Sequence, residues 1–126
     1  MYGKLLSAER IVMAVPVFFL GLSALTKAFI DRAQSLWMRK HVLGIKPTTA
    51  GVRRKGFLLS VGGYGGSERL FACNRSVIKA FYMSCGFTYA GEILVPGIDG
   101  LGEIEKLGSL REEAHRACAQ FIDFST

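Results

Sequence analysis

The stretch Ile11-Val12-Met13-Ala14-Val15-Pro16-Val17-Phe18-Phe19-Leu20-Gly21 decides the fold. It is an uninterrupted apolar run rich in β-branched and aromatic residues, which is typical of a buried strand in a parallel sheet. A membrane or export segment would also be apolar. However, Pro16 divides the run, Glu9 lies in its basic flank, and a transmembrane helix needs roughly 18–20 apolar residues. We therefore predict a strand over Ile11–Phe19 and no membrane segment.

Length and composition fit one globular domain. The chain has 126 residues, of which 50% are hydrophobic and 21% are charged. Its three cysteines, Cys73, Cys85 and Cys118, form no CxxC pair and have no histidine nearby in the sequence. We expect no metal site, buried free thiols at Cys85 and Cys118, and a reducing, cytoplasmic compartment.

Three apolar segments alternate with helical patterns along the chain. The predicted strands are Ile11–Phe19, Gly56–Val61 and Thr88–Val95. Such alternation predicts βαβ units, with a parallel sheet and helices on both faces. The predicted helices are a helix end over Met1–Glu9, a helix over Leu22–Trp37 with Ser23 as N-cap, a helix over Leu70–Cys85 that stops at Gly86, and a last helix with a capping box of Ser109 and Glu112 that buries Leu110, Ala114, Ala117, Cys118 and Phe121.

The carboxyl ends of the predicted strands mark the expected ligand site, because open parallel sheets bind their ligands there. These ends lead into Pro16–Gly21, Gly62–Ser67 and Pro96–Gly102. The second segment begins Gly62-Gly63-Tyr64-Gly65-Gly66, which no regular element tolerates. Glycines allow close approach of the backbone to a ligand, although they also occur in tight turns that bind nothing.

A basic connection runs from residue 39 to residue 55. Eight of the sixteen basic residues lie between Lys27 and Lys55, whereas seven of the ten acids lie between Glu92 and Asp123. Such a segment could bind a polyanion or could simply be a solvated loop. No aromatic residue alternates with its basic residues, so we do not expect nucleic acid. The basic residues concerned are Arg39, Lys40, Lys46, Arg53, Arg54 and Lys55.

Two motifs resemble one known family. Val15-Pro16-Val17-Phe18-Phe19, followed by Ser23-Ala24-Leu25-Thr26-Lys27-Ala28-Phe29-Ile30-Asp31-Arg32, is similar to the SPVYFGxxSAxLKxFIDR signature of the NADPH-dependent FMN reductase and iron–sulfur flavoprotein group. Gly62–Glu68 is similar to the glycine-rich GGxE segment of that group. Both motifs occur in the family's order, and the resemblance covers essentially the whole chain. It implies a flavodoxin-like fold.

The resemblance also implies a cofactor and a reaction. FMN would be the cofactor, and NADPH or NADH would be the transient hydride donor, with no acid or base required from the protein. We therefore nominate no catalytic residue. The isoalloxazine ring would lie between two loops, and the implied cofactor-binding residues are Pro16, Val17, Phe18, Phe19, Gly62, Gly63, Tyr64 and Gly65.

The chain departs from the family in two respects. Val15, Phe18 and Leu20 stand where the family has serine, tyrosine and glycine. Family members also begin with two strands, their helices and a phosphate-binding loop, none of which precedes Met1 in this sequence. We therefore predict one incomplete domain over residues 1–126: a three-layer α/β parallel sheet, flavodoxin-like, lacking the first two strands and the phosphate-binding loop. A truncated family member is favoured over a degenerate protein or half of a two-chain assembly.

The missing strands would leave Ile11–Phe19 at the edge of the sheet. A long, apolar, uncharged edge predicts a homo-oligomer or pairing with another chain. The main functional hypothesis is an FMN-binding NAD(P)H-dependent oxidoreductase of the FMN or quinone reductase type. The alternatives are a non-catalytic α/β module that pairs through this edge, and a polyanion-binding protein that uses the basic residues 39–55.

Overall fold

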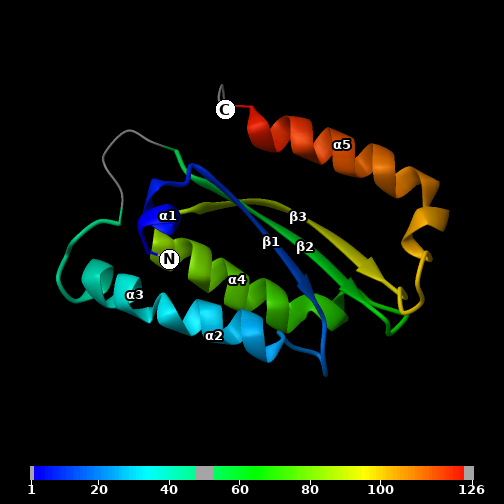
Figure 1. Cartoon of the computed structure of the whole chain (residues 1–126), viewed down its shortest axis with the longest axis horizontal. Coiled ribbons are helices and arrows are strands. Elements are labelled where there is room, and N and C mark those ends of the chain that lie inside the picture. The colour runs from blue at the N-terminus through cyan, green and yellow to red at the C-terminus, as the bar shows by residue number, and fades with distance from the viewer. Residues whose placement is uncertain (1, 48–52, 124–126) are drawn as a thin grey trace.

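The computed structural model describes residues 2–47 and 53–123, and these form three layers (Figure 1). The central layer is a parallel sheet in the order β1-β2-β3, and α5 lies on one face while α2, α3 and α4 lie on the other. The predicted α/β class and parallel sheet are therefore confirmed. The elements are α1 (Tyr2–Ser7), β1 (Arg10–Pro16), α2 (Ala24–Arg32), α3 (Gln34–His41), β2 (Lys55–Gly62), η1 (Glu68–Phe71), α4 (Ala72–Cys85), β3 (Thr88–Pro96), η2 (Ile104–Lys106) and α5 (Gly108–Ile122).

The core lies between the sheet and the helices α2, α3 and α4. Alternate residues of the strands point to this side, as the pleat requires, so Val15 and Leu58 are buried there. Tyr82 of α4 is fully buried at the centre, and its hydroxyl donates to the carbonyl of Phe57 over 2.6 Å. None of the helices in the described ranges is both long enough and apolar enough to cross a bilayer.

Two of the predicted helix ends are confirmed. The Ser23 hydroxyl accepts from the Thr26 N–H over 3.3 Å and caps α2. Gly86 has φ +79° and ends α4, and Phe87 then donates to the Tyr82 carbonyl. The helix predicted over Leu22–Trp37 is instead divided at Ala33, where α2 ends and α3 begins.

Other predicted boundaries were wrong. The first strand ends at Pro16 because the chain turns sharply after Val17, so Phe18 and Phe19 are not part of it. The last helix begins at Gly108, so Ser109 lies inside its first turn and makes no capping bond. Of the face predicted to be buried on α5, only Phe121 is buried.

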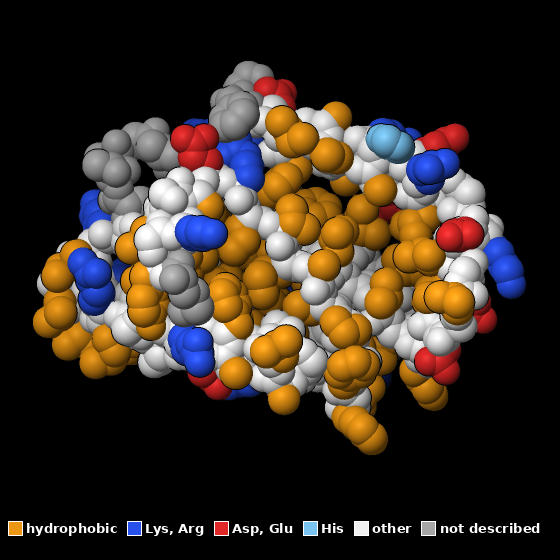
Figure 2. Space-filling view, in the orientation of Figure 1, with side chains coloured by type: hydrophobic (Ala, Val, Ile, Leu, Met, Phe, Trp, Pro, Cys, Tyr) orange, Lys and Arg blue, Asp and Glu red, His pale blue; other side chains and the backbone are white. Residues whose placement is uncertain are grey.

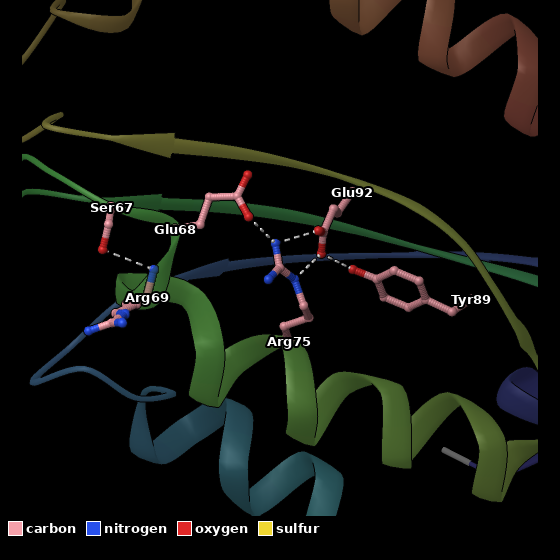
Figure 3. Close-up of polar contacts among 6 residues, drawn as sticks. All are labelled: Ser67, Glu68, Arg69, Arg75, Tyr89 and Glu92. Atoms are coloured by element: carbon pink, nitrogen blue, oxygen red, sulfur yellow. Dashed lines mark hydrogen bonds and ion pairs between the residues drawn. The ribbon is translucent and has the colours of Figure 1, made fainter.

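A polar cluster joins α4 to β3 on the surface of the domain (Figure 3). Arg75 of α4 donates to Glu92 of β3 over 2.9 Å and lies 3.3 Å from Glu68 of η1. Tyr89 also donates to Glu92. Burial alone would raise the pKa of the Glu92 carboxyl, but the hydrogen bonds from Arg75 and Tyr89 outweigh it and hold that pKa below its usual range.

This lowered pKa predicts a pH dependence of stability. A carboxyl with a depressed pKa stabilises the fold above its unfolded pKa, about 4.3 for glutamate, and this contribution disappears as pH falls through the folded pKa. We expect Glu92→Gln to lower the free energy of unfolding at neutral pH, and expect its difference from wild type to shrink below about pH 4. Urea titrations over a pH series measure this, with Glu105→Gln on η2 as control. A gap that stays constant with pH would contradict the prediction.

Candidate functional site

Three loops meet at the carboxyl ends of the strands. The first loop follows β1, the second follows β2 and the third follows β3. The first loop begins at Val17, whose N–H donates to the Val61 carbonyl over 2.8 Å. The third loop is held to β2 in the same way, since Ile98 donates to the Gly62 carbonyl over 3.1 Å. The structure therefore brings the first two loops next to each other at this edge. Together with Pro16 and Gly62, the last residues of β1 and β2, these loops contain all the predicted cofactor-binding residues.

The first loop is a tight turn of an unusual kind. Phe18 and Gly21 exchange two backbone hydrogen bonds of 2.9 Å, and the two residues between them, Phe19 and Leu20, have φ of +47° and +62°. Two positive φ angles define a type I′ turn, which normally contains asparagine and glycine. Left-handed backbone costs a side-chain-bearing residue on the order of 1–2 kcal/mol. Such strain is concentrated at functional sites.

Aromatic side chains project into solvent from the first two loops. Phe19 is completely exposed, Phe18 is 57% exposed and Tyr64 is 77% exposed. Large aromatic side chains normally bury most of their surface, and exposed apolar groups that gather at one edge mark a binding site. A flat apolar ligand is the kind of molecule that these surfaces can cover.

The glycines of the second loop have different roles. A Cβ at Gly62 would lie 2.7 Å from Leu70 Cδ2, and one at Gly63 would lie 2.8 Å from Asp99 Oδ1. Gly62 is therefore required for packing against the buried Leu70, whereas a side chain at Gly63 would displace only the exposed side chain of Asp99. Gly65, by contrast, faces open space. Within the described ranges, the N–H groups of Gly63, Tyr64 and Gly65 donate no hydrogen bond, so they are available to a ligand.

A buried polar cluster supports the first loop, and the sequence patterns did not reveal it. Asn74 is fully buried in α4 and its Nδ2 donates to the Pro16 carbonyl over 3.3 Å. Ser60 of β2 donates to the Val15 carbonyl over 2.7 Å and accepts from Asn74. Within the described structure Asn74 Oδ1 is buried without a partner. One feature of the sequence could have indicated this cluster: Asn74 is a polar residue on the same helical face as the apolar Phe71 and Ile78.

The carboxylate of Glu103 holds the third loop through hydrogen bonds to its backbone. Glu103 Oε2 accepts the N–H groups of Asp99 and Gly100 over 2.9 and 2.8 Å, and these bonds lower the pKa of the Glu103 carboxyl. Asp99 lies beside Gly63 of the second loop, where its carboxylate would meet an added Cβ. The third loop therefore supports the glycine loop from the side of β3.

The basic segment does not form the predicted polyanion site as a unit. Arg54 is 3% exposed and donates to three backbone carbonyls. Its guanidinium is therefore part of the packed structure and does not face a ligand in solution. Lys40 belongs to α3 and donates to the Met83 carbonyl over 2.7 Å. Residues 48–52 of this segment lie outside the described residues.

The three cysteines differ in their burial. Cys85 is buried as expected, but Cys118 is exposed, which corrects its predicted burial, and Cys73 is exposed as well. Across residues 2–47 and 53–123, no group of three or more histidine, cysteine, aspartate or glutamate side chains could hold a metal ion. The cavity of about 710 Å³ between β3 and α5 is lined by Arg53, Thr88 and other residues away from the three loops.

Comparison with known proteins gives a family match and a fold match. The family model described as NADPH-dependent FMN reductase matches residues 1–87. The structure of the Trp repressor binding protein from Bacillus subtilis superposes with a TM-score of 0.62 and 21% identity, over 99% of this chain and 75% of that chain. A thermophilic tryptophan halogenase from Streptomycin violaceusniger superposes with a TM-score of 0.52 and 18% identity, over 97% of this chain and 71% of that chain. No curated protein sequence matches. At these identities the structures show the fold alone, and the predicted flavodoxin-like α/β fold is confirmed.

Proposed function

Since the chain belongs to the NADPH-dependent FMN reductase family, we propose that it binds FMN and acts as an FMN-dependent NAD(P)H oxidoreductase. The observation that carries the site assignment is the strained type I′ turn, which holds Phe19 fully exposed at the same edge of the sheet as the glycine loop. Strain at that position has no role in the packing of the core. It has a role if the turn presents its aromatic residue to a ligand.

The isoalloxazine ring fits this edge in its chemistry. It is flat and largely apolar, and it carries carbonyl and nitrogen acceptors on its rim. The exposed aromatic side chains of Phe18, Phe19 and Tyr64 supply faces for stacking. The N–H groups of Gly63 and Gly65 supply donors. The ring-binding residues of this proposal are Pro16, Val17, Phe18, Phe19, Gly62, Gly63, Tyr64 and Gly65.

The protein's contribution to the reaction would be binding and orientation. FMN, when bound, supplies the chemistry of accepting two electrons from NADPH or NADH and passing them to an acceptor. Asn74 and Ser60 hold the carbonyls of Pro16 and Val15, and so fix the position of the first loop. The exposed aromatic residues exclude water from the ring that they cover. No side chain has to donate or remove a proton.

We expect Phe19→Ala to weaken binding of FMN by about 10- to 100-fold, because burying an aromatic side chain contributes about 1.5–3 kcal/mol. Titration of the purified chain with FMN, followed by flavin fluorescence and absorption in the blue, measures the affinity. Leu43→Ala is the control, since Leu43 is 65% exposed but follows α3, away from the loops.

Two outcomes would count against this proposal. A wild-type chain that takes up no flavin would favour the non-catalytic α/β module instead. Equal losses in the Phe19 and Leu43 variants would show that flavin binds somewhere other than the first loop. We also propose that the chain is cytoplasmic, and its three free cysteines support this location.

A further inference from the structure

The last turn of α3 and the residues after it form an exposed apolar surface, which we name the α3 tip (residues 37–46). Val42 is 60% exposed and Leu43 is 65% exposed, and Ile45 is 44% exposed. Met38 lies one turn before Val42 on the same side of the helix and is exposed as well. Exposed apolar side chains that gather in one place mark an interaction site.

The backbone holds these side chains in a fixed position. The N–H of Leu43 donates to the Met38 carbonyl over 3.3 Å. The N–H of Ile45 donates to the Arg39 carbonyl over 2.9 Å. Gly44 has φ +66°, a conformation that favours glycine, and turns the chain at the end of the helix. The apolar side chains therefore project together from one ordered turn.

Basic side chains surround the apolar ones. From Arg32 to Pro47 the sequence has four basic residues and no acidic residue. Arg39 and Lys46 are exposed, and within the described ranges neither side chain makes a hydrogen bond or an ion pair. Figure 2 shows hydrophobic side chains gathered around basic ones at the left end of the molecule, where α3 ends in Figure 1. The α3 tip is therefore both apolar and positively charged.

Two other occupants fit this surface less well. In a dimer built on it, the basic residues of one copy would face those of the other, and like charges at an interface repel. A nucleic acid or an acidic peptide would pair with the basic residues but would leave Val42, Leu43 and Ile45 in contact with water. The surface fits a partner that is anionic on the outside and apolar just beneath.

We propose that the α3 tip docks the protein onto the surface of an anionic lipid bilayer. Val42, Leu43 and Ile45 enter the boundary between headgroups and acyl chains. Arg39 and Lys46 stay beside the lipid phosphates, because long basic side chains bury their stems and keep their charge at the surface. The contact needs no helix that spans the bilayer.

Docking through the α3 tip leaves the three loops accessible. In Figure 1 the tip lies at one end of the long axis, and the carboxyl ends of the strands point toward the other end. The proposed flavin site therefore faces away from the bilayer. Lipid binding does not depend on flavin binding, so the failure of either proposal leaves the other intact.

The one tryptophan of the chain reports on this contact. Trp37 lies in the α3 tip and is 37% exposed. Vesicles of phosphatidylcholine with about a quarter phosphatidylglycerol should shift its emission to shorter wavelengths, because the indole moves out of water. Vesicles of phosphatidylcholine alone should bind at least about tenfold more weakly, since each basic residue near an anionic surface strengthens binding about fivefold.

The contribution of charge is tested by a pair of double variants. Arg39→Gln with Lys46→Gln should raise the Kd for anionic vesicles about 25-fold. Lys106→Gln with Arg111→Gln is the matched control, because it removes the same charge from exposed positions on η2 and α5, away from the α3 tip (Figure 1). The control should change the Kd by less than about twofold, since salt screens distant charges.

The apolar contribution is tested by a second pair. Leu43→Ser should raise the Kd about tenfold, because the serine gains little from entering the apolar boundary. Leu101→Ser is its control, since Leu101 is fully exposed in the third loop at the other end of the molecule. Circular dichroism reports the fold of every variant.

Four results would overturn the proposal. The first is Trp37 emission that does not change with anionic vesicles at about 1 mM lipid. The second is an equal loss of binding in a test variant and its control. The third is binding to polyglutamate as tight as to anionic vesicles, with no loss in Leu43→Ser, because charge alone would then be recognised. The fourth is a wild-type dimer, seen by sedimentation, that Leu43→Ser dissociates, because a second copy would then cover the α3 tip.

Discussion

Replacing Arg54 with methionine is expected to lower the free energy of unfolding by about 3–5 kcal/mol. The guanidinium donates to the carbonyls of Leu5, Ala8 and Cys85, and each buried carbonyl left without a donor costs about 1–3 kcal/mol. Because water can reach part of the site, the total loss of stability should be smaller than the sum of the costs for the three carbonyls. Since small domains have a total stability of about 5–15 kcal/mol, this variant should unfold at much lower urea concentrations.

The effect is large because Arg54 joins three segments. The Cys85 carbonyl is at the carboxyl end of α4, where a positive charge also interacts favourably with the helix dipole. The guanidinium carbon lies 3.8 Å from the centre of the Phe87 ring. Burial lowers the pKa of Arg54, yet arginine stays charged at neutral pH.

Arg53→Met is the matched control for this prediction, since Arg53 is exposed and adjacent in sequence. Urea unfolding followed by circular dichroism should show little change for the control. Similar losses in both variants would mean that the carbonyl contacts of Arg54 are not the source of the stability.

Gly56→Ala is expected to destabilise the protein by about 2–3 kcal/mol, which is the upper part of the range for overpacking a core. A Cβ at this position would lie 2.7 Å from two ring carbons of Tyr82. The ring cannot move away, because Tyr82 is fully buried and its hydroxyl is hydrogen-bonded to Phe57. Thermal unfolding measures the effect.

Two further variants identify the cause. Tyr82→Leu should be destabilising alone, but combining it with Gly56→Ala should cost less than the sum of the single losses, because the clash is removed. Gly3→Ala adds the same methyl group within α1, where open space surrounds it, and should stabilise by up to about 1 kcal/mol. Additive losses in the double variant would contradict a steric cause.

The order of strands and helices could be predicted from the sequence because the signals are local. The apolar run before Pro16, the N-cap at Ser23 and the left-handed Gly86 each depend on a few neighbouring residues. Whether other residues cover an apolar helix face could not be predicted in this way. Cys118 lies on the apolar side of α5, yet it is exposed, because helical spacing shows which side is apolar and not what covers it.

The candidate site was predictable only in outline. The rule for parallel sheets placed it at the carboxyl ends of the strands, and the loops after Pro16 and Gly62 do meet there. The positive φ angles of Phe19 and Leu20 had no signal, since neither residue favours that conformation. The contact between Asn74 and Pro16 spans 58 positions, and single-sequence patterns carry no information on such distant pairs.

The strand order also bears on how the chain folds. Paired residues of β1 and β2 are 45 positions apart, and Lys55 of β2 pairs with Thr88 of β3 across 33. Closing the longer loop costs only about 0.3 kcal/mol more, so loop length does not decide which pair forms first. In the described part of the chain, every strand pairing includes β2, because it is the middle strand. We therefore expect folding to nucleate around β2, so variants there should slow refolding more than variants of equal cost in β1 or β3.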